Sequence, residues 1–226
     1  FSTCKMYIFN LCPFGRRYGR ECCISLIITF DVGNVKFVCQ WHSLTVYFAT
    51  TDNEYHHEAK EGGKSFFDLD AAGVDFVFKL NFQGTLLPTQ VFAKDMADAK
   101  KGCILNISSM NAYTPLTKIP AYSAAKAGIS NFTQWLAVHF SKVGIRVNAI
   151  APGFFSTQQN AKLLWNDDGT PTARTGKILA ATPMGRFGES EELEGGLLFL
   201  INEEAAGFIT GVVLPIDGGF SAYSGV

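Results

Sequence analysis

The stretch from Gly102 to Gly153 is the part of the sequence most informative about the fold and reads GCILNISSMNAYTPLTKIPAYSAAKAGISNFTQWLAVHFSKVGIRVNAIAPG. It begins with a short apolar strand over 102–109 that ends in two hydroxyl side chains. A helix is predicted over 121–141, because apolar residues recur there at helical spacing and would form one buried stripe. A second apolar strand follows over 145–150. The residues of the helical stripe are Ile129, Phe132, Leu136 and Phe140.

The flanking sequence continues this alternation of strands and helices. Residues 68–100 have a helical pattern in which Pro88 marks a kink or a boundary. Residues 189–204 form another predicted helix, acidic in its first turn as the helix dipole favours, and 210–216 form a last strand. The alternation predicts an α/β fold, a Rossmann-like doubly wound parallel sheet with helices on both faces. Ligands bind such sheets at the carboxyl ends of the strands, where Ser109 lies.

Length and charge narrow the class of protein. The 226 residues suit a single globular domain. A net charge of −1 gives no indication of nucleic-acid or anionic-membrane binding. No apolar run reaches the roughly 18 residues that span a bilayer, and the first residues lack the pattern of a signal peptide. The chain begins at Phe1 rather than Met, which suggests an incomplete or processed N-terminus.

The six cysteines favour a reducing compartment. None belongs to a C-x-x-C pair, so a disulfide or zinc site is the less favoured interpretation. Reduced, mostly buried thiols in a cytoplasmic protein are the simpler one. The sequence EYHHE at 54–58 is interpreted as a solvated helix start, so no metal is expected. The cysteines are Cys4, Cys12, Cys22, Cys23, Cys39 and Cys103.

Tyr122 and Lys126 are the first candidates for chemistry. They are four residues apart on a predicted helix and therefore share one face. An ammonium group beside a phenol favours the phenolate and lowers the phenol pKa from about 10, which suits general acid–base catalysis near neutral pH. Taken alone, such a pair is better explained as an exposed pair on a helix surface.

Neighbouring polar residues strengthen the catalytic interpretation. Ser109 ends a strand, where its hydroxyl can donate a hydrogen bond to a carbonyl as negative charge develops on it. Asn81 lies inside the preceding helix, although asparagine is a mediocre helix former and needs solvent or a function there. Pro152 and Gly153 form a turn without bulky side chains, which lets a ligand approach the backbone. Thr157 follows with a hydroxyl in reach of the same crevice.

Five motifs in a fixed order carry a family resemblance. From about Ala49 to Val226, the sequence resembles the short-chain dehydrogenase/reductase family. The resemblance implies an enzyme that moves hydride between a nicotinamide cofactor and a small alcohol or ketone, in which no metal takes part. The motifs are N-x-x-G at 81–84, N-I-S-S at 106–109, Y-S-A-A-K at 122–126, N-A-I-A-P-G at 148–153, and I-T-G with D-G-G within 209–219.

The resemblance also implies a role for each candidate. Tyr122 would donate and accept the proton, and Lys126 would lower its pKa and hold the nicotinamide ribose. Ser109 would polarise the carbonyl, and Asn81 would support a water-linked proton relay. The family further implies a homotetramer built on the two long helices. The cofactor-binding residues would be Tyr122, Lys126, Pro152, Gly153, Phe155 and Thr157.

A narrower resemblance is to the bacterial fructuronate reductase (D-mannonate oxidoreductase) branch. It rests on the segments 160–174, 182–188 and 218–226. The branch implies a sugar-acid substrate, covered by a long loop over 156–177. The carboxylate of this substrate would pair with Arg174 or Lys162, since arginine suits bidentate carboxylate binding. Equally, the two charged side chains could serve only to solvate a mobile lid. Further candidates for substrate contact are Met110 and Asn111, whereas Arg186 would brace the loop.

Residues 1–48 depart from the family pattern. They are basic and rich in Phe and Cys, and they contain neither a T-G-x-x-x-G-x-G turn nor an N-x-A-G strand end. The nearest equivalent is GRRYGRE at 15–21, where Glu21 stands in place of the third glycine and would repel phosphate. We therefore divide the chain into a divergent segment, 1–48, and a catalytic and substrate-binding part, 49–226, within a single domain.

The divergent start leaves three interpretations open. The chain is an active NAD(P)-dependent reductase with an unusual N-terminus, a non-catalytic homologue that has lost cofactor binding, or the product of a truncated or frameshifted gene. The residue that distinguishes NAD from NADP belongs to this region, and the fructuronate branch favours NAD. The partners expected are a small sugar acid and further copies of the chain, with no nucleic acid and no membrane.

Overall fold

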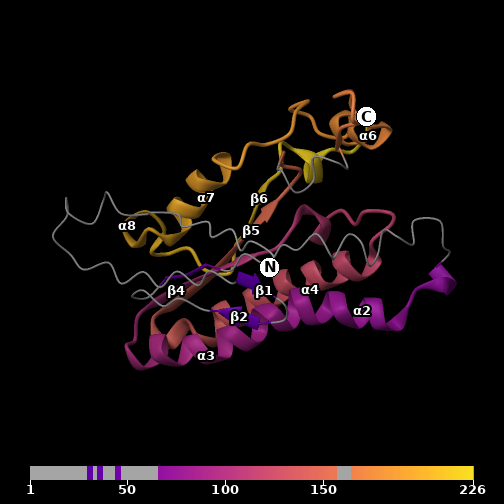
Figure 1. Ribbon diagram of the computed structural model, residues 1–226. Coiled ribbons are helices and arrows are strands. Elements are labelled where there is room, and N and C mark those ends of the chain that lie inside the picture. Colours follow the sequence, from indigo (N-terminus) through magenta and orange to yellow (C-terminus); the bar gives the residue numbers. More distant parts are fainter. Residues whose placement is uncertain (1–29, 33–34, 38–43, 47–65, 157–163, 226) are drawn as a thin grey trace.

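The protein contains a four-stranded parallel sheet, which confirms the predicted fold class. The computed structural model describes residues 30–32, 35–37, 44–46, 66–156 and 164–225 (Figure 1). Neighbouring strands pair in the order β3–β4–β5–β6, and every pair is parallel. The strands are β3 (Leu44–Val46), β4 (Gly102–Ile107), β5 (Ile145–Pro152) and β6 (Val213–Ile216).

The segment before residue 48 contributes to two sheets. Strand β3 pairs in parallel with β4, with Leu44 opposite Cys103. Strands β1 (Phe30–Val32) and β2 (Val35–Phe37) form a separate antiparallel pair. The glycine-containing stretch at 15–21 and the EYHHE stretch lie outside the described residues, and the division of the chain at residue 48 stays a prediction.

Helices cover both faces of the sheet, as the alternating sequence predicts (Figure 1). Helices α2 (Ala71–Phe78), α3 (Gly84–Asp98) and α4 (Pro120–His139) lie on one face, and α7 (Glu192–Ile201) and α8 (Glu203–Ala206) lie on the other. Successive residues of a strand point to opposite faces. Accordingly, Ile104 packs against Leu136 of α4, whereas Leu105 packs against Leu200 of α7.

The helical region predicted over 68–100 is irregular at a different place from the one expected. A π-helical segment, η2 (Lys79–Gln83), separates α2 from α3, and Pro88 lies inside α3. The N–H that Pro88 lacks would have bonded to the carbonyl of Gly84, where the π segment already passes into the α-helix. The proline therefore removes its hydrogen bond beside an existing irregularity, and the boundary precedes it.

Two further elements differ from the predicted ones. The helix predicted over 189–204 is broken at Asn202, whose side chain accepts hydrogen bonds from the N–H groups of Glu204 and Ala205 and thereby caps α8. The long loop predicted over 156–177 already contains the start of α6 (Ala173–Ala180), which Thr172 caps. The break at Asn202 and the start of α6 both depend on capping by a side chain, which apolar periodicity does not reveal.

Short 3₁₀ turns connect these elements. They are η1 (Phe66–Asp68), η3 (Met110–Ala112), η4 (Ser141–Val143) and η5 (Phe220–Ala222). Cys103 on β4 is a free, buried thiol whose pKa is raised by burial; the other cysteines lie outside the described residues. Among the described helices, none combines the length and the apolar character that crossing a membrane requires.

Candidate active site

The carboxyl end of β4 leads directly into the candidate Ser109. Pairing with β5 continues one residue past the strand, because the N–H of Ser108 donates to the carbonyl of Ile150 at 2.8 Å. Ser109 keeps an extended backbone and caps η3, its Oγ accepting from the N–H of Asn111 at 3.2 Å. Because the Ser109 oxygen is the acceptor in this bond, the hydrogen of the Ser109 hydroxyl can still be donated to a carbonyl.

Helix α4 holds Tyr122 and Lys126 one turn apart. It begins with Pro120, a residue that suits the first turn because its missing N–H has no intrahelical partner there. The Nζ atom of Lys126 lies 5.5 Å from the centroid of the Tyr122 ring. Lys126 is 3% exposed, and its ammonium donates to the carbonyl of Ile107 at 3.2 Å. A cation held in so dry a place favours a negative charge on the neighbouring phenol.

Asn81 lies in the π segment η2, which packs against α4. Its side chain is 1% exposed, and its Nδ2 donates to the carbonyl of Val77 at 3.1 Å. Its Oδ1 is buried and has no hydrogen-bond partner among the residues that the structure describes. Single π turns are frequent at functional sites, and this one carries a buried acceptor in a segment that packs against the helix bearing Tyr122.

The carboxyl end of β5 carries Pro152 and Gly153 beside the end of β6. A Cβ atom on Gly153 would lie 2.6 Å from the Cα of Asp217, so glycine is required here by the close approach of two chain segments. The sequence explanation, an approach by a ligand, is therefore not needed to account for this glycine. The N–H of Gly153 donates to the carbonyl of Ile216 at 2.9 Å and fixes the turn.

Phe155 forms a parallel bridge with Gly188. The N–H of Gly188 donates to the carbonyl of Phe154, and the N–H of Ser156 donates to the carbonyl of Gly188. In such a bridge the N–H and C=O of the central residue point to the opposite side, so those of Phe155 face away from Gly188. Thr157 lies outside the described residues.

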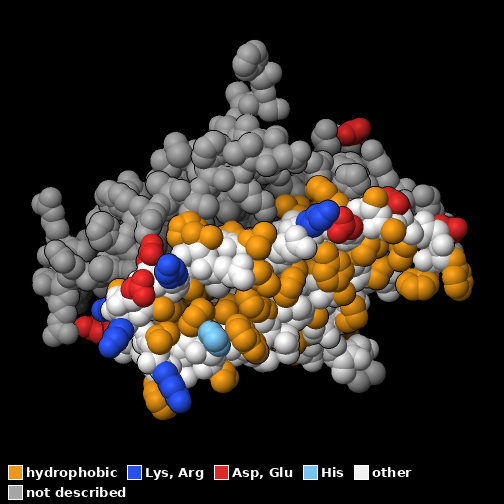
Figure 2. All heavy atoms as spheres, turned by 90° about the horizontal axis from the view of Figure 1, so that it is seen from below, with side chains coloured by type: hydrophobic (Ala, Val, Ile, Leu, Met, Phe, Trp, Pro, Cys, Tyr) orange, Lys and Arg blue, Asp and Glu red, His pale blue; other side chains and the backbone are white. Residues whose placement is uncertain are grey.

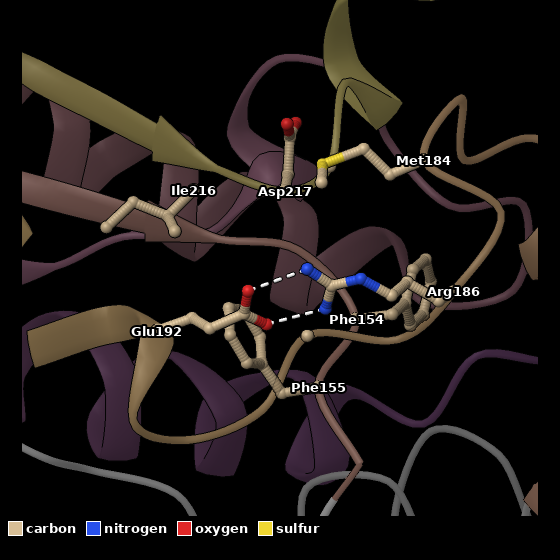
Figure 3. Close-up of a pocket in the computed structure, with 9 residues that line it drawn as sticks. Phe154, Phe155, Met184, Arg186, Glu192, Ile216 and Asp217 are labelled. Carbon is tan, nitrogen blue, oxygen red and sulfur yellow. Dashed lines mark hydrogen bonds and ion pairs between the residues drawn. The ribbon is translucent and has the colours of Figure 1, made fainter.

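A small pocket is lined in part by Phe154 and Phe155 (Figure 3). In it, the guanidinium of Arg186 meets the carboxylate of Glu192 in two hydrogen bonds of 2.6 and 2.7 Å. This pairing, followed by a bond from the N–H of Glu189, lowers the pKa of Glu192 to about 2. The carboxylate of Asp217 points away from the pair and accepts from backbone N–H groups. Arg186 is thus tied to the first turn of α7, and its predicted bracing of the 156–177 loop stays a prediction.

The substrate candidates lie in different surroundings. Met110 and Asn111 are buried in η3, which packs against α4. Arg174 is half-buried in the first turn of α6, and burial lowers the pKa of its guanidinium. Helix α6 is attached to the end of β5, because its Ile178 belongs to an apolar cluster with Phe154. Lys162 lies outside the described residues.

Sequence reasoning gave no role to two polar residues of β5. Arg146 donates to the carbonyl groups of Leu200 and Ile201 and so caps the end of α7. Asn148 donates to the carbonyl of Ile209 and accepts from the N–H of Val212, which fixes the loop before β6. Their common signal is a polar side chain in the middle of an otherwise apolar strand, because a buried polar group needs a specific partner.

Comparisons with known proteins agree with this architecture. A family model described as Enoyl-(Acyl carrier protein) reductase matches residues 25–221. The chain belongs to the short-chain dehydrogenase/reductase family.

Two bacterial oxidoreductases of uncharacterised activity are similar to the chain. One, from Haemophilus influenzae, is 68% identical over 179 residues, covering 79% of this chain and 63% of that protein. The other, from Bacillus subtilis and named UxuB, is 58% identical over 178 residues, covering 79% of this chain and 64% of that protein. The chain therefore spans less than two thirds of the length of these relatives.

Solved structures show the same fold with dinucleotides bound. A provisionally named D-mannonate oxidoreductase from Haemophilus influenzae, with bound NAD, has a TM-score of 0.69 at 52% identity, covering 81% of this chain and 79% of that chain. A provisionally named 2-deoxy-D-gluconate 3-dehydrogenase from Agrobacterium tumefaciens, with bound NADP, has a TM-score of 0.64 at 33% identity, covering 70% of this chain and 63% of that chain.

Proposed function

We propose that the protein is an NAD(P)-dependent oxidoreductase that interconverts a secondary alcohol and a ketone on a sugar acid such as fructuronate or mannonate. The observation that carries the proposal is the buried ammonium of Lys126 against the ring of Tyr122, on a helix packed beside the strand end that bears Ser109. This arrangement combines a proton donor with a hydrogen-bond donor for a carbonyl oxygen.

In this proposal, Tyr122 transfers the proton. During reduction, its hydroxyl gives a proton to the carbonyl oxygen while Ser109 donates a hydrogen bond to the same oxygen; oxidation reverses both steps. Lys126 stabilises the phenolate that remains. Asn81 supports proton return through its buried Oδ1, which can accept a hydrogen bond from a water molecule.

The described residues fit the nicotinamide half of a dinucleotide. When bound, the nicotinamide supplies or accepts the hydride. The backbone N–H and C=O of Phe155, directed away from Gly188, match the acceptor and donor of a carboxamide, beside the turn at Pro152 and Gly153. Tyr122 and Lys126 would bind the ribose, and Thr157 the carboxamide. We favour NAD, which the D-mannonate oxidoreductase structure contains, and NADP is the alternative.

The proposed substrate carries a carboxylate. The same related structure supports this choice by its name, and Arg174 supplies a half-buried guanidinium that suits a carboxylate. Met110 and Asn111 would shape the substrate side from within η3, next to Ser109. We place this sugar-acid metabolism in the cytoplasm, in keeping with the cysteine pattern.

We further propose that the protein forms a homo-oligomer, with a tetramer as the family state, through the outer face of α3 and α4. Figure 2 shows apolar side chains gathered on this side of the molecule. Lys126 is the one Lys, Arg, Asp or Glu of α4, and it is buried. A long helix whose exposed surface carries no such charge is typical of a subunit interface. The exposed apolar residues are Leu87, Val91, Trp135 and Val138.

The proposed activity is tested by following NADH oxidation at its absorbance maximum with fructuronate as substrate. We expect turnover that saturates with fructuronate, and much weaker turnover with the uncharged ketose of the same carbon skeleton, because the carboxylate pairs with Arg174. Arg174→Met should remove this preference by raising KM for the acid. Equal kcat/KM for both sugars would exclude a sugar acid as the preferred substrate.

A further inference from the structure

Three successive residues at the end of β4 bond to α4. The Nδ2 of Asn106 donates to the Oγ1 of Thr133 at 2.9 Å. The carbonyl of Ile107 accepts from the ammonium of Lys126 at 3.2 Å. The Oγ of Ser108 donates to the carbonyl of Lys126 at 3.2 Å and lies 2.6 Å from the Oγ of Ser130. Polar bonds thus continue along the strand up to the residue before Ser109.

These bonds follow the repeats of both elements. Asn106 and Ser108 lie two apart on the strand and share the face toward α4, where Ile104 makes an apolar contact one step earlier. Their partners on α4 lie at spacings of four and three residues and so share one face of the helix. Asn106 and Thr133 have no exposed surface, and Ser108 is 2% exposed. Buried polar groups are costly unless paired, so the bonds specify one register.

The bonds at Ser108 have a defined direction. A hydroxyl has one hydrogen, and that of Ser108 is donated to the carbonyl of Lys126. In the short hydrogen bond between the two serine hydroxyls, the donor must then be Ser130. Ser108 therefore accepts a hydrogen bond from Ser130 and donates one to the backbone carbonyl of Lys126.

Lys126 is consequently fixed at both ends by β4. Its carbonyl accepts from Ser108, and its ammonium donates to Ile107. Tyr122 lies one turn before it, and Ser109 follows Ser108 directly. We propose that Ser108 and Ser130 are positioning residues, which set Tyr122 and Lys126 against Ser109 by fixing the register between α4 and the end of β4. The catalytic consequence of this inference rests on the proposed oxidoreductase function.

The kinetic test uses Ser108→Ala, Ser130→Ala and the double variant. Each single change should lower kcat about tenfold, the effect of one misplaced hydrogen bond, while KM and the dissociation constant of NADH change little. The double variant should lose no more than the worse single variant, because both residues act through one contact. Ser130→Thr keeps a hydroxyl and should retain kcat. An unchanged kcat in both single variants would overturn the proposal.

A matched control separates positioning from loss of a buried hydroxyl. Thr89 on α3 is 2% exposed, and its Oγ1 donates to the carbonyl of Thr85 at 2.7 Å, within its own helix. Thr89→Val removes this hydroxyl without touching β4, so kcat should stay unchanged even if thermal stability falls. Equal losses of kcat in Thr89→Val and Ser130→Ala would show that the loss comes from reduced stability, and would contradict a positioning role for Ser130.

A second readout does not depend on turnover. Ultraviolet difference titration against a Tyr122→Phe background isolates the ionisation of the Tyr122 phenol. Displacing Lys126 should move this midpoint to higher pH in Ser108→Ala and Ser130→Ala, but not in Thr89→Val. If the unchanged protein shows no turnover, the proposed function fails while this titration still decides the positioning. A midpoint equal to that of the unchanged protein in both serine variants overturns the inference.

Discussion

Tyr122 and Lys126 form the contact on which the proposed proton transfer depends. Tyr122→Phe removes the hydroxyl and keeps the ring beside the ammonium, so it should reduce kcat by at least about a hundredfold and leave NADH binding largely intact. Steady-state kinetics and a binding titration measure the two effects. Tyr113→Phe is the control, because the Tyr113 hydroxyl bonds to the carbonyl of Val213 outside the proposed proton path. Substantial residual turnover would remove Tyr122 from the mechanism.

The pair of Arg186 and Glu192 predicts a pH dependence of stability. The folded pKa of Glu192, about 2, lies below the ordinary value of 4.5, so its contribution is complete above pH 4.5 and is lost as pH falls toward 2. The melting temperature of the unchanged protein should exceed that of Glu192→Gln at pH 6, and the difference should shrink as pH falls below 4.5. The pair is exposed, so the difference will be small.

Thermal melts across this pH range should use Glu194→Gln as the control, because Glu194 is exposed on the same helix. A difference between the unchanged protein and Glu192→Gln that stays constant from pH 6 to 2 would show that the ion pair does not form in solution.

Sequence reasoning reached the site residues unequally. It selected Ser109, Tyr122 and Lys126 as candidates, because strand ends and a four-residue helical spacing are local properties. It did not reveal the close contact between Gly153 and Asp217, because that contact joins segments far apart in the chain. It left Ser108 without a role for the same reason: its partners belong to α4. Three-dimensional register, rather than residue type, distinguishes positioning residues from catalytic ones.

Among the secondary-structure elements, apolar patterns predicted those whose position depends on burying an apolar stripe. The strand, helix and strand within 102–153 were predicted close to their observed bounds, since each buries a continuous stripe. The break at Asn202 and the start of α6 were not, because single capping side chains, Asn202 and Thr172, determine them; apolar spacing did not reveal the π segment either. Propensity is a weak guide where one cap decides between a helix and a turn.

The Asn202 cap gives a test at this scale. Asn202→Ala removes the acceptor for two N–H groups at the start of α8 and should reduce the free energy of unfolding by about 1 kcal/mol. Asn202→Asp keeps the acceptor and should retain stability. Chemical denaturation measures both. If both variants unfold with the midpoint of the unchanged protein, the cap contributes nothing and another interaction must break the helix.

At the scale of the whole molecule, the apolar face of α3 and α4 predicts self-association (Figure 2). Val138 is 77% exposed and Trp135 is 56% exposed in the isolated chain. Val138→Lys places a charge on this face and should shift the molar mass measured by light scattering toward that of the monomer. Phe208→Lys, at an apolar residue after α8 that is more exposed than Val138, should leave the mass unchanged. A monomeric unchanged protein would contradict the proposed assembly.

The proposed function requires that this chain binds a nicotinamide dinucleotide and exchanges hydride with it. The first test is a titration of the purified protein with NADH, followed by tryptophan fluorescence or calorimetry, with circular dichroism to show that the protein is folded. We expect saturable binding in the micromolar range, retained in Tyr122→Phe. A folded protein that binds no NADH would contradict it and leave a member of the family that has lost its cofactor.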